Sequence, residues 1–223
     1  MRLGIRLLFA FFLINGIAAF FVLRVFTAEI KPSVREVMED MMVDTANLLA
    51  ELASDDLAAG RLAQGDTDSA FARHVRNYVR RPIDAGIWGF AKQSLDYRIY
   101  VTDATGRVLF DSQGQAVGQD FSQWRDVART LRGEYGARMT REVPSDDTSG
   151  VMHVAAPVRV QGRILGVLTV AKPVRTVQRF IDRAERKVLM GGLVLLLLSA
   201  AVGVAVTLWM VWNVRRLRDY ALS

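Results

Sequence analysis

Two long uncharged stretches constrain this chain more than any other feature. Residues 7–23, LLFAFFLINGIAAFFVL, and residues 188–212, VLMGGLVLLLLSAAVGVAVTLWMVW, contain no charged side chain. A helix needs about 20 predominantly apolar residues to cross the hydrocarbon core of a bilayer. We therefore predict transmembrane helices at residues 7–26 and 188–212, with a segment of about 160 residues between them.

The first stretch has an alternative interpretation as a cleaved signal peptide, because Arg2 and Arg6 precede it and the small pair Ala18-Ala19 lies within it. Cleavage after Ala19 would cut inside the apolar run, so an uncleaved anchor fits better. The two arginines also predict the orientation, with residues 1–6 in the cytoplasm. Residues 27–187 would then be periplasmic, and residues 213–223 would return to the cytoplasm, as in a multi-pass protein of the bacterial inner membrane.

Composition adds two constraints on the exported segment. The chain has no cysteine, so this segment has no disulfide and must be stabilised by its own core. The net charge is +6, but the basic residues are scattered along the chain, which favours a soluble surface near lipid headgroups over a nucleic-acid site.

The first part of the exported segment has helical periodicity. Apolar residues at three- and four-residue spacing predict a long amphipathic helix that starts near Pro32 and ends before Gly60. Residues 69–81, SAFARHVRNYVRR, predict a second helix that Pro82 ends. Residues 83–93 have no clear period, and we predict irregular structure there.

The period then changes to two. YRIYVTDATGRVLFDS predicts a hairpin around the turn at residues 103–106, and a short helix should follow, capped near Asp120 or Ser122 and closed by Gly133. A second hairpin turns at Gln161 and Gly162. Its strands are nearly continuous in apolar residues, so they should be central and covered on both faces. Residues 174–187 predict a last helix that runs into the second apolar stretch.

This order of elements predicts an α+β fold: one antiparallel sheet with helices on one side and a long N-terminal helix, placed between two transmembrane helices. Within the long helix, the apolar positions Met38, Met41, Leu48 and Leu52 form a seam that faces either the sheet or a second copy of the same helix.

Several fragments together resemble a known family. YVTDATGRVLFDS, VGQDFSQWRDV, LRGEYGAR, VMHVAAPV and GVLTVAKP are similar to the periplasmic PAS-like (PDC or Cache) sensor domain of two-component sensor histidine kinases of the CreC type, over about residues 1–220. The resemblance implies a homodimeric membrane receptor with a HAMP or signalling linker starting at NVRRLRDYALS. It also implies a kinase core that uses ATP and Mg and passes a phosphoryl group to a cytoplasmic response regulator.

That kinase core is not visible in this sequence. The two histidines, in RHVRN and MHVAA, do not fit the pattern of a phospho-accepting histidine, and no catalytic motif or ligand-spaced metal site is present. We therefore expect no catalytic residue, cofactor or metal in these residues, which look like the sensory half of a longer protein. The alternatives are the sensor of a chemoreceptor or of a cyclic-dinucleotide enzyme, or a stand-alone membrane-anchored binding protein.

The resemblance also implies where a signal would act. In such folds small molecules bind between the sheet and the helix and loops packed on it, and a buried anion there needs charge-assisted donors. The input is then a small anionic ligand or a periplasmic protein. For signal relay through the last helix we expect Arg186, Arg215 and Arg216 to matter. The candidate ligand-binding residues are Tyr100, Asp103, Trp124, Arg125, Arg138, His153 and Lys172.

Overall fold

The computed structural model describes residues 2–25, 28, 31–64, 69–87, 90–93, 95–146 and 149–221. The chain divides into two compact units, which are treated separately below. The first consists of Met1–Val34 and Arg179–Ser223, and the second of Arg35–Gln178. The second unit contains the sheet and the candidate site.

The first unit contains the apolar helices. Both uncharged stretches are helical, as predicted: α1 spans Arg2–Val25 and α5 spans Arg175–Ala221. Within α5, Ile181–Met210 contains an 18-residue window with a mean hydropathy of 2.5 and is long and apolar enough to cross a membrane. The apolar part of α1 within the described residues, Phe9–Val25, is shorter.

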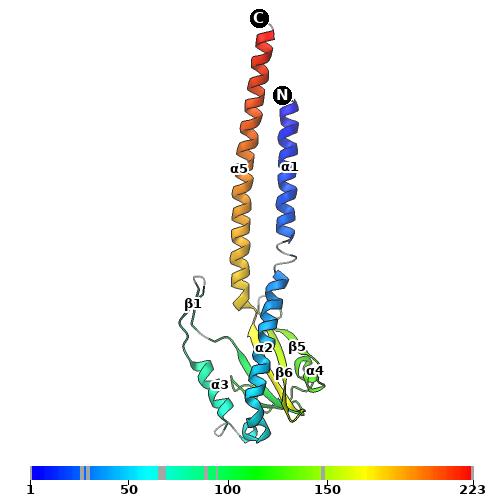
Figure 1. Ribbon diagram of the computed structural model, residues 1–223, viewed down its shortest axis with the longest axis vertical. Coiled ribbons are helices and arrows are strands. Elements are labelled where there is room, and N and C mark those ends of the chain that lie inside the picture. The colour runs from blue at the N-terminus through cyan, green and yellow to red at the C-terminus, as the bar shows by residue number, and fades with distance from the viewer. Residues whose placement is uncertain are drawn as a thin grey trace. The chain divides into compact units, whose positions relative to one another are not determined.

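The second unit is built on a five-stranded antiparallel sheet (Figure 1). Both predicted hairpins are confirmed. Gln161 and Gly162 both have positive φ, which matches the twist of the strands that this two-residue turn connects. The order across the sheet is β4-β3-β7-β6-β5, and the strands are β3 (Arg98–Asp103), β4 (Val108–Asp111), β5 (Gly136–Arg141), β6 (Gly150–Val160) and β7 (Arg163–Pro173).

Two parts of the sheet prediction were wrong. The edge strand β5 was not predicted, because its residues on one face, Gly136, Arg138 and Thr140, are small or polar and conceal the period of two. Residues 83–93 are not entirely irregular, since β1 (Ala85–Ile87) and β2 (Phe90–Lys92) pair as a small separate hairpin.

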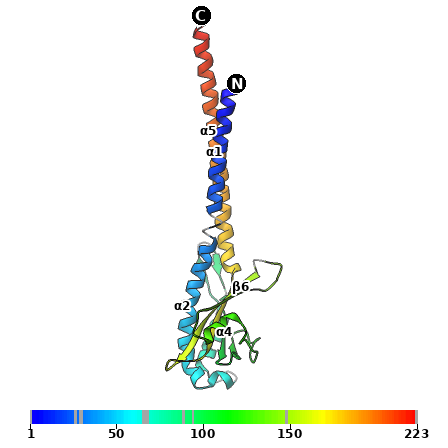
Figure 2. The same ribbon diagram turned by 90° about the vertical axis from the view of Figure 1, so that its right-hand side faces the viewer.

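Helices cover both faces of the sheet, whereas the sequence predicted helices on one side only. α2 (Lys31–Ala58) and α3 (Ala70–Arg80) pack on one face, while α4 (Arg125–Leu131) packs on the other, and Figure 2 shows α2 and α4 on opposite sides of the strands. The prediction that the central strands are covered on both faces is thereby confirmed.

The long helix α2 contributes one buried stripe to the core on its face of the sheet. The stripe consists of Met42, Ala46, Ala50 and Ala53. The predicted seam is divided by this arrangement. Met38 is 5% exposed and belongs to the core, while the other three members of the seam are about 60% exposed: Met41, Leu48 and Leu52.

A buried carboxylate joins α2 to α3. Asp56 accepts hydrogen bonds from Arg61 Nε (2.6 Å), Ser69 Oγ (2.7 Å) and the backbone N–H of Phe71 (2.8 Å). Ser69 is also the N-cap of α3, accepting a bond from Ala72 N. Arg61 begins a short 3₁₀ helix, Arg61–Gln64, that leads away from α2.

The short helix α4 begins later than predicted. Neither predicted cap, Asp120 or Ser122, starts the helix. Asp120 instead accepts a hydrogen bond from Ser122 N (2.8 Å) in a turn ahead of it. The actual N-cap is Trp124, whose side chain makes no capping bond. The predicted end is confirmed, since Gly133 follows the helix with a φ of 79°.

Candidate functional site: a polar cluster beneath α4

One row of residues crosses the sheet on the face that α4 covers. Tyr100 on β3 pairs with Thr169 on β7, which pairs with Ala155 on β6, which pairs with Gly136 on β5. A Cβ at Gly136 would collide with the carbonyl oxygen of Asp126 and the hydroxyl of Thr130, so α4 lies directly on the sheet at this point. The two small residues of the row therefore make room for the helix.

Asp126, in the first turn of α4, is the centre of the cluster. Its carboxylate is fully buried, and both oxygens are bound by groups from the sheet. Arg138 Nε donates to Oδ1 at 2.7 Å, while the hydroxyls of Tyr100 and Thr169 donate to Oδ2. Burial and the neighbouring Asp126 charge raise the pKa of Tyr100 above its ordinary value, so its hydroxyl remains a donor.

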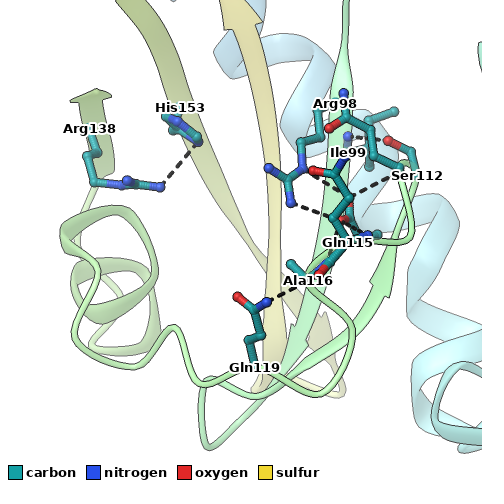
Figure 3. A network of polar contacts seen from close by, with 10 residues as sticks. Arg98, Ile99, Ser112, Gln115, Ala116, Gln119, Arg138 and His153 are labelled. Atoms are coloured by element: carbon teal, nitrogen blue, oxygen red, sulfur yellow. Dashed lines mark hydrogen bonds and ion pairs between the residues drawn. The ribbon is translucent and has the colours of Figure 1, made fainter. Parts of the chain in front are cut away.

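Arg138 connects Asp126 to two further groups. Its guanidinium lies over the ring of Trp124, with 4.0 Å to the ring centroid. Nη2 lies 3.3 Å from Nδ1 of His153 on the adjacent strand, and Figure 3 shows Arg138 turned toward this ring. The side chain is 17% exposed, so the cation lies at the edge of the buried cluster.

His153 is held as the neutral ring. Arginine can only donate, so Nδ1 accepts from Arg138, and Nε2 carries the proton that is donated to Thr140 Oγ1 at 3.0 Å. Burial, followed by the Arg138 charge, lowers the pKa of His153 to about 4. The imidazole thus acts as a neutral link between β5 and β6.

The structure brings together four of the seven predicted ligand-binding residues, Tyr100, Trp124, Arg138 and His153. The other three lie elsewhere. Asp103 belongs to the β3–β4 turn, where its carboxylate accepts from the backbone N–H groups of residues 105 and 107. Arg125 is exposed on α4. Lys172 is on the opposite face of the sheet, with Nζ 4.8 Å from the centroid of the Tyr97 ring.

Sequence reasoning missed Asp126, Thr140 and Thr169, which complete the cluster. A signal for Asp126 was present, because it is next to Val127 and four residues before Thr130, and these three residues form the buried side of α4. Thr140 belongs to the strand that was not predicted.

The relay residues all lie on α5. Arg186 is exposed, and Arg215 and Arg216 are within the last turns of the helix, where the structure describes the backbone only. Among the described residues there is no group of three His, Asp or Glu side chains that could hold a metal ion.

A separate groove of about 720 Å³ lies on the other face, between α2 and α3. Its lining is mostly apolar and includes Leu48, Leu52, Phe71 and Val75, with Asp55 among the polar members. It shares no residue with the cluster around Asp126.

A five-stranded antiparallel sheet with a long helix on one face and a short helix over a polar cluster on the other is an α+β fold of the PAS-like (PDC or Cache) type. Sequence comparison narrows this class. Sensor protein CreC of Escherichia coli (strain K12) is 45% identical over all 223 residues, and the chain spans 46% of that protein's length. The chain is therefore related over its whole length to CreC-type sensor proteins, and it corresponds to about half of one. No protein-family model matches the sequence.

Solved structures with related architecture are sensor and ligand-binding domains. The Vibrio cholerae histidine kinase DctB sensor domain has a TM-score of 0.48 at 16% identity, covering 70% of this chain and 55% of that one. The E. coli DcuS sensor domain has a TM-score of 0.42 at 19% identity, covering 66% and 98%. The ligand-binding domain of the Campylobacter jejuni chemoreceptor Tlp3, in complex with 4-methylisoleucine, scores 0.46 at 13% identity, covering 76% and 62%.

Proposed function

We propose that this chain is the sensory portion of a membrane-bound two-component histidine kinase. The observation that carries the proposal is the 45% identity to Sensor protein CreC over the whole chain. Residues 7–26 and 188–212 cross the bacterial inner membrane, and residues 27–187 sense a periplasmic signal. Autophosphorylation, ATP and Mg binding and transfer to a response regulator belong to the part of such a protein that follows these residues.

The contacts between these elements support a signal path that runs from the polar cluster through β7 to α5. Thr169 on β7 donates to Asp126, and the strand ends four residues later at Pro173. Val174 N then donates to Gly150 O at 2.7 Å, and α5 begins at Arg175. α5 continues as one helix to Ala221. A continuous helix transmits displacement or rotation along its length, so movement at β7 reaches the cytoplasmic end.

A chimaera tests this function. The chain is joined to the remaining part of E. coli CreC in cells that lack the native protein, and phosphorylation of the cognate response regulator is measured. Replacing Ala184 and Glu185 with a Gly-Gly pair makes α5 locally flexible, whereas an Ala-Ala pair at the same positions preserves both the helix and Arg186. We expect the glycine pair to abolish signal-dependent output and the alanine pair to retain it. Equal output from both variants would contradict relay through α5.

The exposed face of α2 supports a homodimer. Met41, Leu48 and Leu52 are each about 60% exposed and lie seven and four residues apart, which is the spacing of a helix–helix seam. An exposed apolar stripe of this kind on a helix is favoured when a second helix covers it. We propose that α2 of a second copy of the chain covers this stripe.

A further inference from the structure

The groups around Asp126 form a complete donor set for a carboxylate. A cation and two hydroxyls converge on its two oxygens, and all three belong to the sheet, on β5, β3 and β7: Arg138, Tyr100 and Thr169. Charge-assisted donors in this arrangement are what a protein uses to bind a carboxylate ligand. Here the carboxylate is supplied by the chain itself.

The donors and the acceptor are on separate pieces of the domain. The three donor strands are hydrogen-bonded to one another through the sheet, whereas Asp126 comes from a helix of seven residues. This helix starts without a side-chain capping bond, and at its N-terminal end the Trp124 ring stacks on Phe121 and contacts the Arg138 guanidinium. If α4 moved away, a preformed donor set would be left without its anion, which is costly in a buried site.

The surface beneath α4 would also accommodate a small ligand. The row of residues that starts at Tyr100 ends with Ala155 and Gly136. These two residues are small and make room for the α4 backbone. Thr130 Oγ1 is buried against Gly136 and has no hydrogen-bond partner among the described residues. Because Thr130 belongs to α4, this buried hydroxyl without a partner makes the closed position of the helix less favourable.

We propose that Arg138, Tyr100 and Thr169 form a carboxylate-binding site whose resident occupant is Asp126, and that a small external carboxylate takes its place when α4 leaves the sheet. Asp126 is thus a tethered ligand that keeps the site closed. That this exchange of carboxylates is the sensory event rests on the proposed function. The binding of a carboxylate at this site does not depend on it.

Chemical rescue tests the proposal on the full chain in detergent micelles. Asp126→Ala removes the tethered carboxylate, and thermal unfolding is followed while sodium formate or sodium acetate is added. Sodium chloride and sodium phosphate at equal ionic strength are the controls for general salt and other anions. We expect Asp126→Ala to unfold at a lower temperature than the wild type and to be stabilised saturably by formate or acetate. Its apparent affinity should exceed that of the wild type by at least about tenfold, because no internal anion competes.

Two further variants keep the test decisive. Gly136→Ala retains Asp126 but adds a Cβ that collides with α4, so this variant should bind acetate more tightly than the wild type even if Asp126→Ala does not fold. Adding Arg138→Met to either variant should abolish the carboxylate effect. Equal stabilisation by chloride and acetate, or a carboxylate effect that survives Arg138→Met, would overturn the proposal. Because these measurements use no kinase, a failed chimaera with successful rescue would refute the signalling role alone.

Discussion

Arg138 and His153 face each other directly across β5 and β6, and the guanidinium Nη2 lies 3.3 Å from the imidazole Nδ1. The same guanidinium binds the buried carboxylate of Asp126 through Nε. The Arg138 side chain therefore joins the edge strand β5, the adjacent strand β6 and α4. The cluster depends on the protonation of its histidine and on the charge of its arginine.

Removing the arginine should destabilise the domain strongly. Arg138→Ala leaves the Asp126 carboxylate buried without a counter-charge, which costs about 3 to 5 kcal/mol of unfolding free energy. Arg125→Ala is the matched control, because Arg125 is exposed on α4 and its loss should change the free energy by less than about 0.5 kcal/mol. Urea unfolding of both variants measures the difference, and similar losses would show that the ion pair is not important for stability.

Acidification should weaken the domain through His153. Burial and the Arg138 charge hold its pKa at about 4 in the folded state, so below a pH of about 6.5 the unfolded state binds more protons than the folded state. The stability that the neutral His153 ring gives the folded state is present in full above that pH and falls as the pH drops. Near pH 4 the free energy of unfolding is lower by about 3 kcal/mol. The charges that face the ring are Arg138 on β5, Asp126 on α4 and Arg98 on β3.

Two histidine variants isolate this effect. His153→Gln removes the titrating ring, so the slope of unfolding free energy against pH between 6.5 and 4 should become shallower. His74→Gln, on the exposed side of α3, should leave the slope unchanged. If His153→Gln keeps the wild-type slope of unfolding free energy against pH, groups other than His153 cause the acid sensitivity.

The joint between α2 and α3 should depend on Asp56. Asp56→Ala leaves the buried Ser69 hydroxyl and the Phe71 N–H without their acceptor, which costs about 1 to 3 kcal/mol. Asp55→Ala, at the exposed neighbouring position, should have little effect. Hydrogen exchange of α3 provides the local readout. If α3 is protected equally in both variants, Asp56 does not hold it.

The α2 seam predicts a change in oligomeric state. Leu48→Glu introduces a charge into the exposed apolar stripe and should convert a dimer of the full chain into a monomer, as measured by light scattering in detergent with the micelle mass subtracted. Val117→Glu is the control, because Val117 is also an exposed apolar residue but lies outside α2. A wild-type monomer, or a dimer that both substitutions leave intact, would exclude this seam.

Local signals in the sequence were sufficient where one element determines its own structure. The turn at Gln161 and Gly162 was predicted because this pair separates two strand-like apolar runs, and both residues have the positive φ of a two-residue hairpin in the structure. β5 was missed because Arg138 and Thr140 lie on its covered face, where polarity is set by partners on other elements.

The candidate site shows the same limit. Arg138 and His153 were predicted as site residues, but the acceptor that joins them to α4 was not, since a lone aspartate in a helix is usually solvated. Lys172 illustrates the opposite error. Its neighbour Ala171 faces α4, so the alternation of a strand places Lys172 on the far face.

In this mechanism the cluster beneath α4 controls output through α5. The most direct test is the autophosphorylation rate of the CreC chimaera in membranes, comparing Asp126→Asn with Arg125→Gln at equal protein levels. Asp126→Asn keeps the shape of the side chain but removes its charge, so we expect a change in rate of about fivefold or more. Arg125→Gln, at the exposed neighbouring position on α4, should leave the rate unchanged. An unchanged rate in Asp126→Asn would contradict control of output by this cluster.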